Sequence, residues 1–487
     1  MLNSIKYFEE KCINRFEELE NNFFKEPTKI AEYVYALTEE LHKLGLEMIK
    51  DSLEAMDIML RESQLRKQNW HIEAKTDKQI TTSLGDVTFK KTLFHHKTTG
   101  EYVYLLDKIM GIAPNQRMTD DAVANLLEEA VQTSYRRGGE ECSLMTEVTK
   151  QSVKNKLHSL KFPKNEERPE NKKKVEYLYI EADEDHVSLQ FREKKGDLVK
   201  NENNQKNNCL ITKLVYIHEG IKKEAPQSNR HCLVNPYYFC GVNTGKGNIQ
   251  FWNEIYEYIV NHYDLDSIKA IYVNSDGGAW IKTGIKQIAH AIHVLDEFHL
   301  EKYLTKLTSH MLDSKWDAKY ELRKVIRKET KKEFNELVDC LEEYPQAAVE
   351  GMETARKYIL DNWTAARLRL QHKAGVVGSS TEGHVSHVLS ERMSTKAMGW
   401  STTGAEKMAQ LRAYKFNRGD MLELVRYQKK DFPKVVGSEY DVLSSTQILS
   451  SESRRHGELG KYLECMKHSM SVHSKKTLYF NSHLWGL

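Results

Sequence analysis

Residues 175–183 read VEYLYIEAD, and this stretch decides the fold. Aromatic and β-branched side chains are frequent in it, which favours a buried β-strand, and the strand ends in an acid, Asp183. More strand-like runs and one long helix follow along the chain. The strands are expected at residues 210–217, 237–242, 268–274 and 291–295, and the helix at residues 248–263.

The expected order of elements is three strands, a helix, a strand, a second helix and a last strand. This is the order of a ribonuclease-H-like α/β domain. In such a sheet the first and fourth strands lie side by side. Asp183 ends the first strand and Asp276 follows the fourth. We therefore expect these two acids to be neighbours, although Asp276 comes 93 residues after Asp183. We assign residues 175–403 to this catalytic domain.

A third acid, Glu382, stands just after a helix-start signal, in the stretch GSSTEGHV at residues 378–385. The apolar side chains that would pack this helix on the sheet are Val385, Val388 and Leu389. Glu382 in the first turn would then face the strand ends. It follows Asp276 by 106 residues, many of which show helical patterns, so we expect a helical insertion at about residues 300–373.

Asp183, Asp276 and Glu382 suit the chemistry of phosphodiester bonds. Two metal ions roughly 4 Å apart can activate the attacking oxygen and stabilise the leaving one. Mg²⁺ prefers oxygen ligands and keeps some of its waters, so a few carboxylates suffice to hold it. Any single acid among 70 Asp and Glu residues is a weak signal, and the order of the three carries the hypothesis. The expected cofactor is two Mg²⁺ or Mn²⁺ ions per active site.

The first 80 residues are expected to be helical. Apolar residues recur there at steps of three and four, the spacing of one helix face: Ile30, Val34, Leu37, Leu41, Leu44 and Met48. Such a stripe either joins two copies of the chain as a coiled coil or packs on its own domain. A β-hairpin is expected within residues 84–106, and a helix from Thr119 onward.

Residues 81–160, which include the hairpin, are expected to bind DNA. They contain a pattern typical of a helix-turn-helix, with elements at residues 134–142 and 148–160. In the second helix Val153 and Leu157 would face inward, while polar side chains suited to base edges and phosphates face out. The outward residues are Lys150, Gln151, Lys154, Asn155 and Lys156. An ordinary helical hairpin would show the same pattern.

Charge is distributed unevenly along the 487 residues, although the net charge is only +2. Residues 150–175 hold nine Lys or Arg and three Glu, and residues 407–434 hold eight basic and three acidic residues. We expect a basic linker at residues 161–174 and a basic helical region at residues 404–487. The candidate DNA contacts in the second region are Lys407, Arg412 and Lys415. Solvated surface is the alternative interpretation of both.

Composition restricts the class of protein. Apolar residues make up 40% of the chain, enough for sizeable cores, and the length implies two to four domains. No apolar run of 18 residues occurs, so no transmembrane helix is expected. The N-terminus lacks the pattern of a signal peptide, which makes the cytoplasm the expected location. The seven cysteines include no CxxC pair and are expected to be reduced thiols.

Four stretches resemble the ISLre family of bacterial insertion-sequence transposases, relatives of the Mutator-like DDE transposases. They are YIEADEDHV at residues 179–187, YVNSDGGAWI at residues 272–281, DEFH at residues 296–299 and STEGHVSHVLSERM at residues 380–393. The resemblance continues with GEYVYLLD at residues 100–107 and MGWS at residues 398–401, and it spans about residues 30–430.

The resemblance implies a DDE active site in a ribonuclease-H-like fold, with Mg²⁺ or Mn²⁺ as cofactor. By position, the metal ligands would be Asp183, Asp276 and Glu382. Asp296 and His299 match the C/DxxH motif of the Mutator relatives, in which the His is expected beside the active site. Asp185 lies two residues from Asp183 on the same strand face and is an alternative to it.

The expected function is therefore that of a DDE transposase, which cleaves DNA and joins the freed strand to new DNA. The expected partners are the inverted repeats at the ends of its element, the target DNA and further copies of the chain, in the bacterial nucleoid. Two rival hypotheses are a nuclease that cuts without joining and a DNA-binding regulator whose catalytic domain is inactive.

Overall fold

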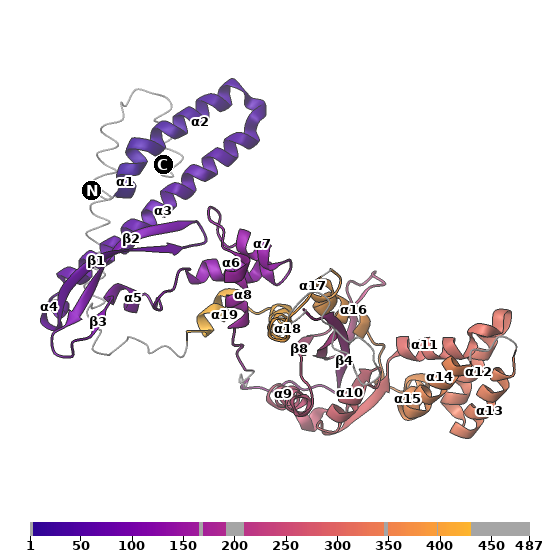
Figure 1. Cartoon of the computed structure of the whole chain (residues 1–487). Coiled ribbons are helices and arrows are strands. Elements are labelled where there is room, and N and C mark those ends of the chain that lie inside the picture. Colours follow the sequence, from indigo (N-terminus) through magenta and orange to yellow (C-terminus); the bar gives the residue numbers. More distant parts are fainter. Residues whose placement is uncertain (1–2, 165–168, 191–208, 345–348, 397, 430–487) are drawn as a thin grey trace. The chain divides into compact units, whose positions relative to one another are not determined.

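The computed structural model describes residues 3–164, 169–190, 209–344, 349–396 and 398–429 (Figure 1). The chain divides into two compact units. The first contains residues 1–123, 142–147 and 429–487, and the second contains residues 124–141 and 148–428. The expected DNA-binding region at residues 81–160 is therefore shared between the units. Residues 430–487 of the expected C-terminal region and residues 165–168 of the expected linker lie outside the described residues.

Helices open the first unit, as predicted. They are α1 (Asn3–Tyr7), the π-helix η1 (Phe8–Cys12), α2 (Ile13–Lys25), the 3₁₀ turn η2 (Pro27–Lys29), α3 (Ile30–Glu62) and α4 (Gln64–Asn69). The predicted apolar stripe lies on α3. Four of its six members, Ile30, Val34, Leu41 and Met48, are 50–58% exposed. The described part of this unit therefore leaves much of the stripe open, and its use in joining two copies stays a prediction.

A three-stranded antiparallel sheet follows, in the order β1-β2-β3. β2 (Asp86–His96) and β3 (Tyr102–Val103) form the predicted hairpin. The preceding strand β1 (Trp70–Thr81) shows that the prediction of helix throughout residues 1–80 is wrong. Only Trp70 and Ile80 of β1 are buried, so the strand lacks the alternation that marks a half-buried strand in a sequence. β1 becomes a strand because β2 pairs with it along its whole length.

Four short helices come next: α5 (Leu105–Ile109), α6 (Asp120–Ala130), α7 (Tyr135–Glu140) and α8 (Lys150–His158). α6 begins directly after Thr119, as predicted. In the second unit α7 packs against α8, and Val153 and Leu157 of α8 are buried, which confirms the predicted inward face. Thr149 caps α8 by accepting a hydrogen bond from the backbone N–H of Ser152 over 3.3 Å.

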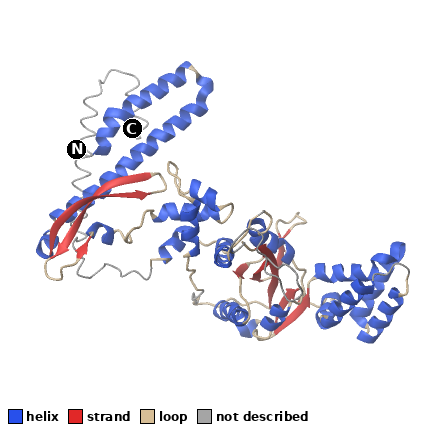
Figure 2. Ribbon diagram, viewed as in Figure 1, coloured by secondary structure: helices blue, strands red, loops and turns tan. Residues whose placement is uncertain are grey.

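A five-stranded mixed sheet lies in the second unit (Figure 2). Its strands are β4 (Tyr177–Ser188), β5 (Cys209–His218), β8 (Tyr237–Gly241), β9 (Ala270–Ser275) and β10 (Ala291–Leu295). They lie in the order β10-β9-β4-β5-β8; β4, β9 and β10 are parallel, and β5 is antiparallel to both of its neighbours. The pairing of β4 with β9 confirms the prediction that the first and fourth strands are neighbours. A small hairpin of β6 (Ile221–Lys223) and β7 (His231–Leu233) was not expected from the sequence.

Helices of the second unit fall into three groups. Two lie between the strands along the chain, α9 (Lys246–His262) and α10 (Ala279–Ile285). A separate group gathers around its own apolar core and confirms the helical pattern predicted at residues 300–373: α11 (Glu297–Thr308), η4 (Ser309–Ser314), α12 (Lys315–Lys328), α13 (Lys331–Glu342), α14 (Val349–Asp361) and α15 (Trp363–Gln371) (Figure 1). The last group is α16 (Thr381–Val385), η5 (Ser386–Ser390), α17 (Glu391–Met393), α18 (Thr402–Phe416) and α19 (Met421–Tyr427).

The two faces of the five-stranded sheet have different covers. Leu178 and Ile180 of β4 belong to an apolar core with side chains of α9 and α10. Side chains of a strand alternate, so Glu181 and Asp183 point to the other face. On that face the sheet meets residues 374–381 and α16, which bring the chain back from the helical insertion.

Candidate functional site

Asp183 and Asp276 lie on neighbouring strands of the sheet. The prediction that Asp183 ends its strand is wrong, because β4 continues to Ser188, whereas Asp276 directly follows β9. Ala182 of β4 pairs with Ser275 of β9, and the two acids are the next residues of these parallel strands. The backbone N–H of Gly278 donates to Asp276 Oδ1 over 2.8 Å, which orients that carboxylate on the turn after β9. Topology thus places side by side two acids that the sequence separates by 93 residues.

The charges of the three predicted acids reach one another. Burial is the main reason that the pKa of Asp183 rises to about 7, and the negative charges of Asp276 and Glu382 raise it as well. His299 acts on Asp183 in the opposite direction. Asp183 therefore lies within the electrostatic reach of both other acids, and a bound cation would relieve the repulsion at Asp183.

Glu382 is the second residue of α16 and is exposed. Its position depends on residues 374–381, which are bonded to the sheet. Tyr179 Oη of β4 donates to the carbonyl oxygen of Gly375 over 2.8 Å. The fold thus uses the far end of the insertion to bring the third acid back to the strand that carries the first.

Arg369 of α15 fixes the same returning segment from the other side. It is buried, and its guanidinium donates to the carbonyl oxygens of Leu295 over 2.8 Å and Val377 over 2.5 Å. It also donates to Asn274 Oδ1 over 2.7 Å. One side chain therefore joins the ends of β9 and β10 to the segment that leads to Glu382.

Glu181 is the strongest anchor of this segment. It is fully buried on β4, two residues before Asp183. Its carboxylate contacts five polar groups: Tyr216 Oη (2.5 Å), His218 Nε2 (3.3 Å), Ser379 Oγ (3.1 Å), the backbone N–H of Ser380 (2.9 Å) and Thr381 Oγ1 (2.8 Å). Three of these five groups belong to the residues directly before Glu382, so Glu181 sets where the third acid begins its helix.

Hydrogen bonds keep Glu181 ionised in this buried position. Burial by itself raises the pKa of a carboxyl group, but the hydrogen bonds from His218, Tyr216 and Thr381 outweigh it and hold the pKa of Glu181 below its usual value. Burial, and then the charge of Glu181, raise the pKa of Tyr216, so its hydroxyl stays a donor.

Asp296 and His299 form a pair at the start of α11. Asp296 caps the helix by accepting from the backbone N–H of His299 over 3.2 Å, and its Oδ2 lies 3.2 Å from His299 Nδ1. Burial lowers the pKa of His299, but the hydrogen bond with Asp296 and the charge of Asp183 more than compensate, so the net shift is upward. The structure therefore brings this predicted pair into electrostatic contact with the acid cluster.

Asp185, the predicted alternative to Asp183, is engaged elsewhere. Its Oδ2 accepts from Ser394 Oγ over 2.8 Å, just after the end of α17. Asp183 is the residue whose pKa both other acids raise. We therefore keep Asp183 as the first acid of the candidate site.

The donor set suits a divalent, oxygen-preferring cation. The three acids supply only carboxylate oxygens, as Mg²⁺ and Mn²⁺ prefer, and they repel one another in the absence of positive charge. Within the described residues no three His, Cys, Asp or Glu side chains already lie close enough to form a ready-made metal site. Asp183, Asp276 and Glu382 are the residues that would hold such ions.

Comparison with known proteins assigns the chain to a family. Residues 23–431 match the family described as "Uncharacterised protein family (UPF0236)". The chain belongs to the UPF0236 family. One relative, from Caldanaerobacter subterraneus subsp. tengcongensis, is 34% identical over 424 residues, which cover 87% of this chain and 86% of the relative. A second protein of that organism, 33% identical with 87% and 85% covered, has a name that joins eleven locus numbers.

More distant similarities were also found. A UPF0236 protein of Streptococcus gallolyticus is 25% identical over 406 residues, which cover 78% of this chain and 82% of the relative. Among solved structures, the Drosophila P element transposase strand transfer complex is 10% identical with a TM-score of 0.24, and the match covers 71% of this chain and 94% of that chain. No described helix of this UPF0236 chain is long and apolar enough to cross a bilayer.

The predicted DNA contacts of the UPF0236 chain differ in exposure. Lys150, Gln151, Lys154 and Asn155 are exposed on α8, and Lys156 is partly exposed. Lys415 forms an ion pair with Glu128, and Lys407 lies over the ring of Phe162 at 5.8 Å.

Arg412 is a correction to the predicted DNA contacts. It is buried, and its guanidinium donates to the carbonyl oxygens of Val388 over 2.7 Å, Val131 over 3.2 Å and His387. A guanidinium bound in this way holds α18 against neighbouring segments, so we exclude Arg412 from the proposed DNA-binding surface.

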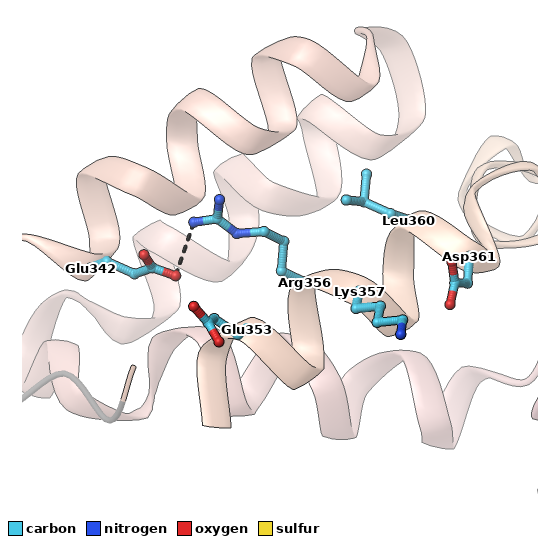
Figure 3. A pocket seen from close by; sticks show the side chains of 6 residues that line it. All are labelled: Glu342, Glu353, Arg356, Lys357, Leu360 and Asp361. Carbon is cyan, nitrogen blue, oxygen red and sulfur yellow. Dashed lines mark ion pairs between the residues drawn. The ribbon is translucent and has the colours of Figure 1, made fainter. Parts of the chain in front are cut away.

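A pocket of about 300 Å³ in the helical insertion offers no comparable site (Figure 3). Arg356 of its lining is already engaged, because it forms ion pairs with Glu342 at 2.9 Å and with Asp339, outside the lining, at 2.6 Å. Glu353 and Lys357 add one charge of each sign to the lining.

Sequence reasoning missed Glu181, Arg369 and Tyr216, which position the candidate site without belonging to the predicted acids. Glu181 carried a usable signal, because an acid inside an otherwise apolar strand must meet donors from elsewhere in the fold. Arg369 lies in α15, a helix without a clear apolar face in its sequence, and nothing in its local pattern separates it from a surface arginine.

Proposed function

We propose that this UPF0236 chain is a DDE transposase, whose second unit is a ribonuclease-H-like catalytic domain interrupted by a helical insertion. The strand arrangement supports the fold assignment. In chain order the five strands lie as 3-2-1-4-5, and the second strand is antiparallel to its neighbours, the arrangement expected of a ribonuclease-H-like sheet.

One observation carries the functional proposal: Asp183, Asp276 and Glu382 come from three distant parts of the chain and share one electrostatic neighbourhood. Acids that repel one another are retained at a cost in stability, which indicates a function. When bound there, Mg²⁺ or Mn²⁺ ions supply positive charge at the attacking and leaving oxygens of a phosphodiester.

The chain's own groups have distinct tasks in this proposal. The three carboxylates would hold the ions, which in turn would orient the scissile phosphate. Glu181 and Arg369 keep the segment before Glu382 in place, so that the third acid stays near the other two. His299 is held by Asp296 beside Asp183, and its raised pKa favours the protonated form, which would offset the developing negative charge of a cleaved phosphate.

The name of one relative supports the hypothesis that genes of this family move within genomes. One relative of 33% identity has a name that joins eleven locus numbers of a single organism. A gene carried at many loci is the expected product of an element that transposes. Membership in the ISLre transposases, the binding of inverted repeats and target DNA, and a homo-oligomer on DNA belong to the same proposal.

The test uses DNA flanking the gene as substrate, in Mg²⁺, in Mn²⁺ and in EDTA. Wild-type protein and two variants, Glu382→Gln and Glu391→Gln, are compared for cut and joined strands. Glu391 is a matched control because it is an exposed Glu at the start of α17, paired with Arg412 at 3.6 Å. We expect metal-dependent joining by wild type and Glu391→Gln, and none by Glu382→Gln.

The same assay separates the rival functions. Cut strands without joined products would favour a nuclease. Tight binding without cutting in either metal would favour a regulator with an inactive catalytic domain. Equal cutting by Glu382→Gln and wild type would contradict the assignment of the third acid.

A further inference from the structure

A pocket of about 360 Å³ lies beside α8, away from the acid cluster. α7, α8 and the segment between α17 and α18 contribute to its lining, which contains Lys150, Lys154, His158 and Arg392 but no Asp or Glu. A pocket whose charged side chains are all cationic is suited to an anionic ligand.

Arg392 is the unusual residue of this pocket. It is 3% exposed, and no Asp or Glu of the described residues lies within 4 Å of its guanidinium. Its Nε donates to the carbonyl oxygen of Ala130 over 3.0 Å. Its guanidinium lies 5.0 Å from the ring centre of Trp400 and 5.9 Å from that of Tyr135. Burial lowers the pKa of Arg392 to about 10, which reflects the cost of a charge without a carboxylate partner.

Arg412 shows what a satisfied buried arginine looks like in the same unit. It donates to three carbonyl oxygens and lies 3.6 Å from Glu391. Arg392 has one backbone acceptor and a thioether, Met398 Sδ at 3.3 Å. The difference leaves Arg392 as a buried cation without a carboxylate partner among the described residues.

Tyr135 offers a second unsatisfied group in the lining. Its hydroxyl is shielded from solvent and has no hydrogen-bond partner among the residues that the structure describes. Its ring packs edge-on against Trp400, with ring centres 6.2 Å apart. A buried hydroxyl without a partner costs free energy, which a ligand with polar atoms would recover.

We propose that this pocket holds one unpaired nucleotide of a DNA strand, with its phosphate near Lys150 and Lys154 and its base beside Tyr135. The proposal rests on the proposed function, for which DNA is the substrate. A volume of about 360 Å³ falls within the roughly 300–1,000 Å³ of small-ligand pockets, so a single nucleotide fits but a double helix does not. Aromatic side chains beside cationic ones are the usual means of holding unpaired strands.

The pocket is connected to the acids through β4. Leu189 bridges to Trp400, and the backbone N–H of Gln190 donates to the carbonyl oxygen of Trp400 over 2.9 Å. From Asp183 to Gln190 an extended chain covers roughly 20 Å. A strand bound in the pocket therefore leaves the acids free to act on a bond several nucleotides away.

Fluorescence anisotropy with a labelled single-stranded oligonucleotide, in EDTA, tests the pocket without cleavage. The variant Lys150→Gln/Lys154→Gln should bind the strand at least about 10-fold more weakly than wild type. The slope of log Kd against log salt concentration should be smaller than that of wild type by about 1.4, which is about 0.7 for each of two lost phosphate contacts. The control Lys302→Gln/Lys328→Gln removes the same charge from exposed positions in the insertion and should bind within about 2-fold of wild type.

A second measurement locates the base. An oligonucleotide with one 5-iododeoxyuridine should crosslink to Tyr135 on irradiation. Tyr135→Leu should lose the crosslink and the preference for a normal strand over an abasic one. The proposal is overturned if the Lys150→Gln/Lys154→Gln variant binds the strand as tightly as wild type does. It is also overturned if wild type binds duplex DNA as tightly as single-stranded DNA, or RNA more tightly than single-stranded DNA.

The outcomes separate this inference from the proposed catalysis. Asp276→Asn should bind the single strand as wild type does, because its carboxylate lies outside the pocket. Strand binding that depends on Lys150 and Lys154, with no cleavage under any metal, would contradict the transposase chemistry and leave the pocket standing. If wild type cleaves DNA but its strand binding does not depend on Lys150 or Lys154, the pocket is contradicted and the transposase chemistry stands.

Discussion

Glu181 and Asp183 lie on the same face of β4, yet their surroundings shift the pKa of the carboxyl group in opposite directions. Glu181 is saturated by polar contacts from five residues, and its pKa stays below the usual value in spite of full burial. Burial raises the pKa of Asp183 to about 7, and the charges of Asp276 and Glu382 add to the shift instead of opposing it. The difference teaches that burial alone does not mark a functional acid; an acid surrounded by donors is an anchor, whereas an acid surrounded by acids is a candidate cation site.

The largest expected effect comes from removing a repelling acid. Asp276→Asn should reduce DNA cleavage by about 10³-fold or more, because a metal-holding carboxylate is lost. The same change removes a negative charge beside Asp183, so the melting temperature without metal should stay equal or rise. Cleavage rate and thermal melting, measured on one preparation, check both. A large fall in melting temperature would show that Asp276 is an anchor like Glu181.

Glu181→Gln should have the contrary profile. The amide keeps the shape but presents N–H donors to groups that are themselves donors, so the free energy of unfolding should fall by about 3 kcal/mol. Cleavage should fall by about 10–100-fold because the segment before Glu382 loses its anchor. Urea unfolding measures the first effect. Glu176→Gln, at an exposed ion pair with Lys269, is the control and should leave the free energy of unfolding within measurement error of wild type.

Metal addition sharpens the comparison without any cleavage assay. Mn²⁺ should raise the melting temperature of wild type by about 2–5 °C, because the cation relieves repulsion among the three acids in the folded state. EDTA should reverse the shift. Asp276→Asn should respond less than wild type, and an equal response of the two proteins would place the binding site elsewhere.

The smallest effect is expected at Asp121, an acid that lies among donors but carries no site. Its carboxylate accepts from the backbone N–H of Ser83 over 2.8 Å. Burial raises its pKa, but hydrogen bonds from Thr119 and Ser83 outweigh burial and lower it. Asp121→Asn should therefore cost about 1 kcal/mol at pH 7.

The pH dependence of that cost follows from the sign of the shift. A pKa lowered by folding stabilises the native state above the unfolded pKa of about 3.9, and the contribution disappears as the pH falls through the folded pKa. Urea unfolding of wild type and Asp121→Asn at pH 7, 5 and 3 should show the difference shrinking at the lowest pH. A difference independent of pH would mean that packing, not charge, holds Asp121.

Local patterns were sufficient for most elements of the second unit. The five strands of the mixed sheet and the helical insertion were predictable because buried strands and amphipathic helices have distinct periods, and the pairing of β4 with β9 followed from the order of the elements. The hairpin of β6 and β7 was not predicted. β1 was missed because its mostly exposed residues lack the pattern of a strand, and only its pairing with β2 makes it one. Arg412 was misassigned because a basic stretch does not reveal which of its cations a helix turns inward.

The sequence by itself determined which residue types are available for chemistry and in what order: one acid in an apolar strand, a second directly after another strand, and a third at the start of a helix 106 residues after the second. Only the tertiary structure decided their surroundings. Whether an acid becomes an anchor or a repelling neighbour depends on groups that arrive from other strands and from the end of the insertion. Electrostatic free energy depends on distances in space, and distances along the chain do not determine them.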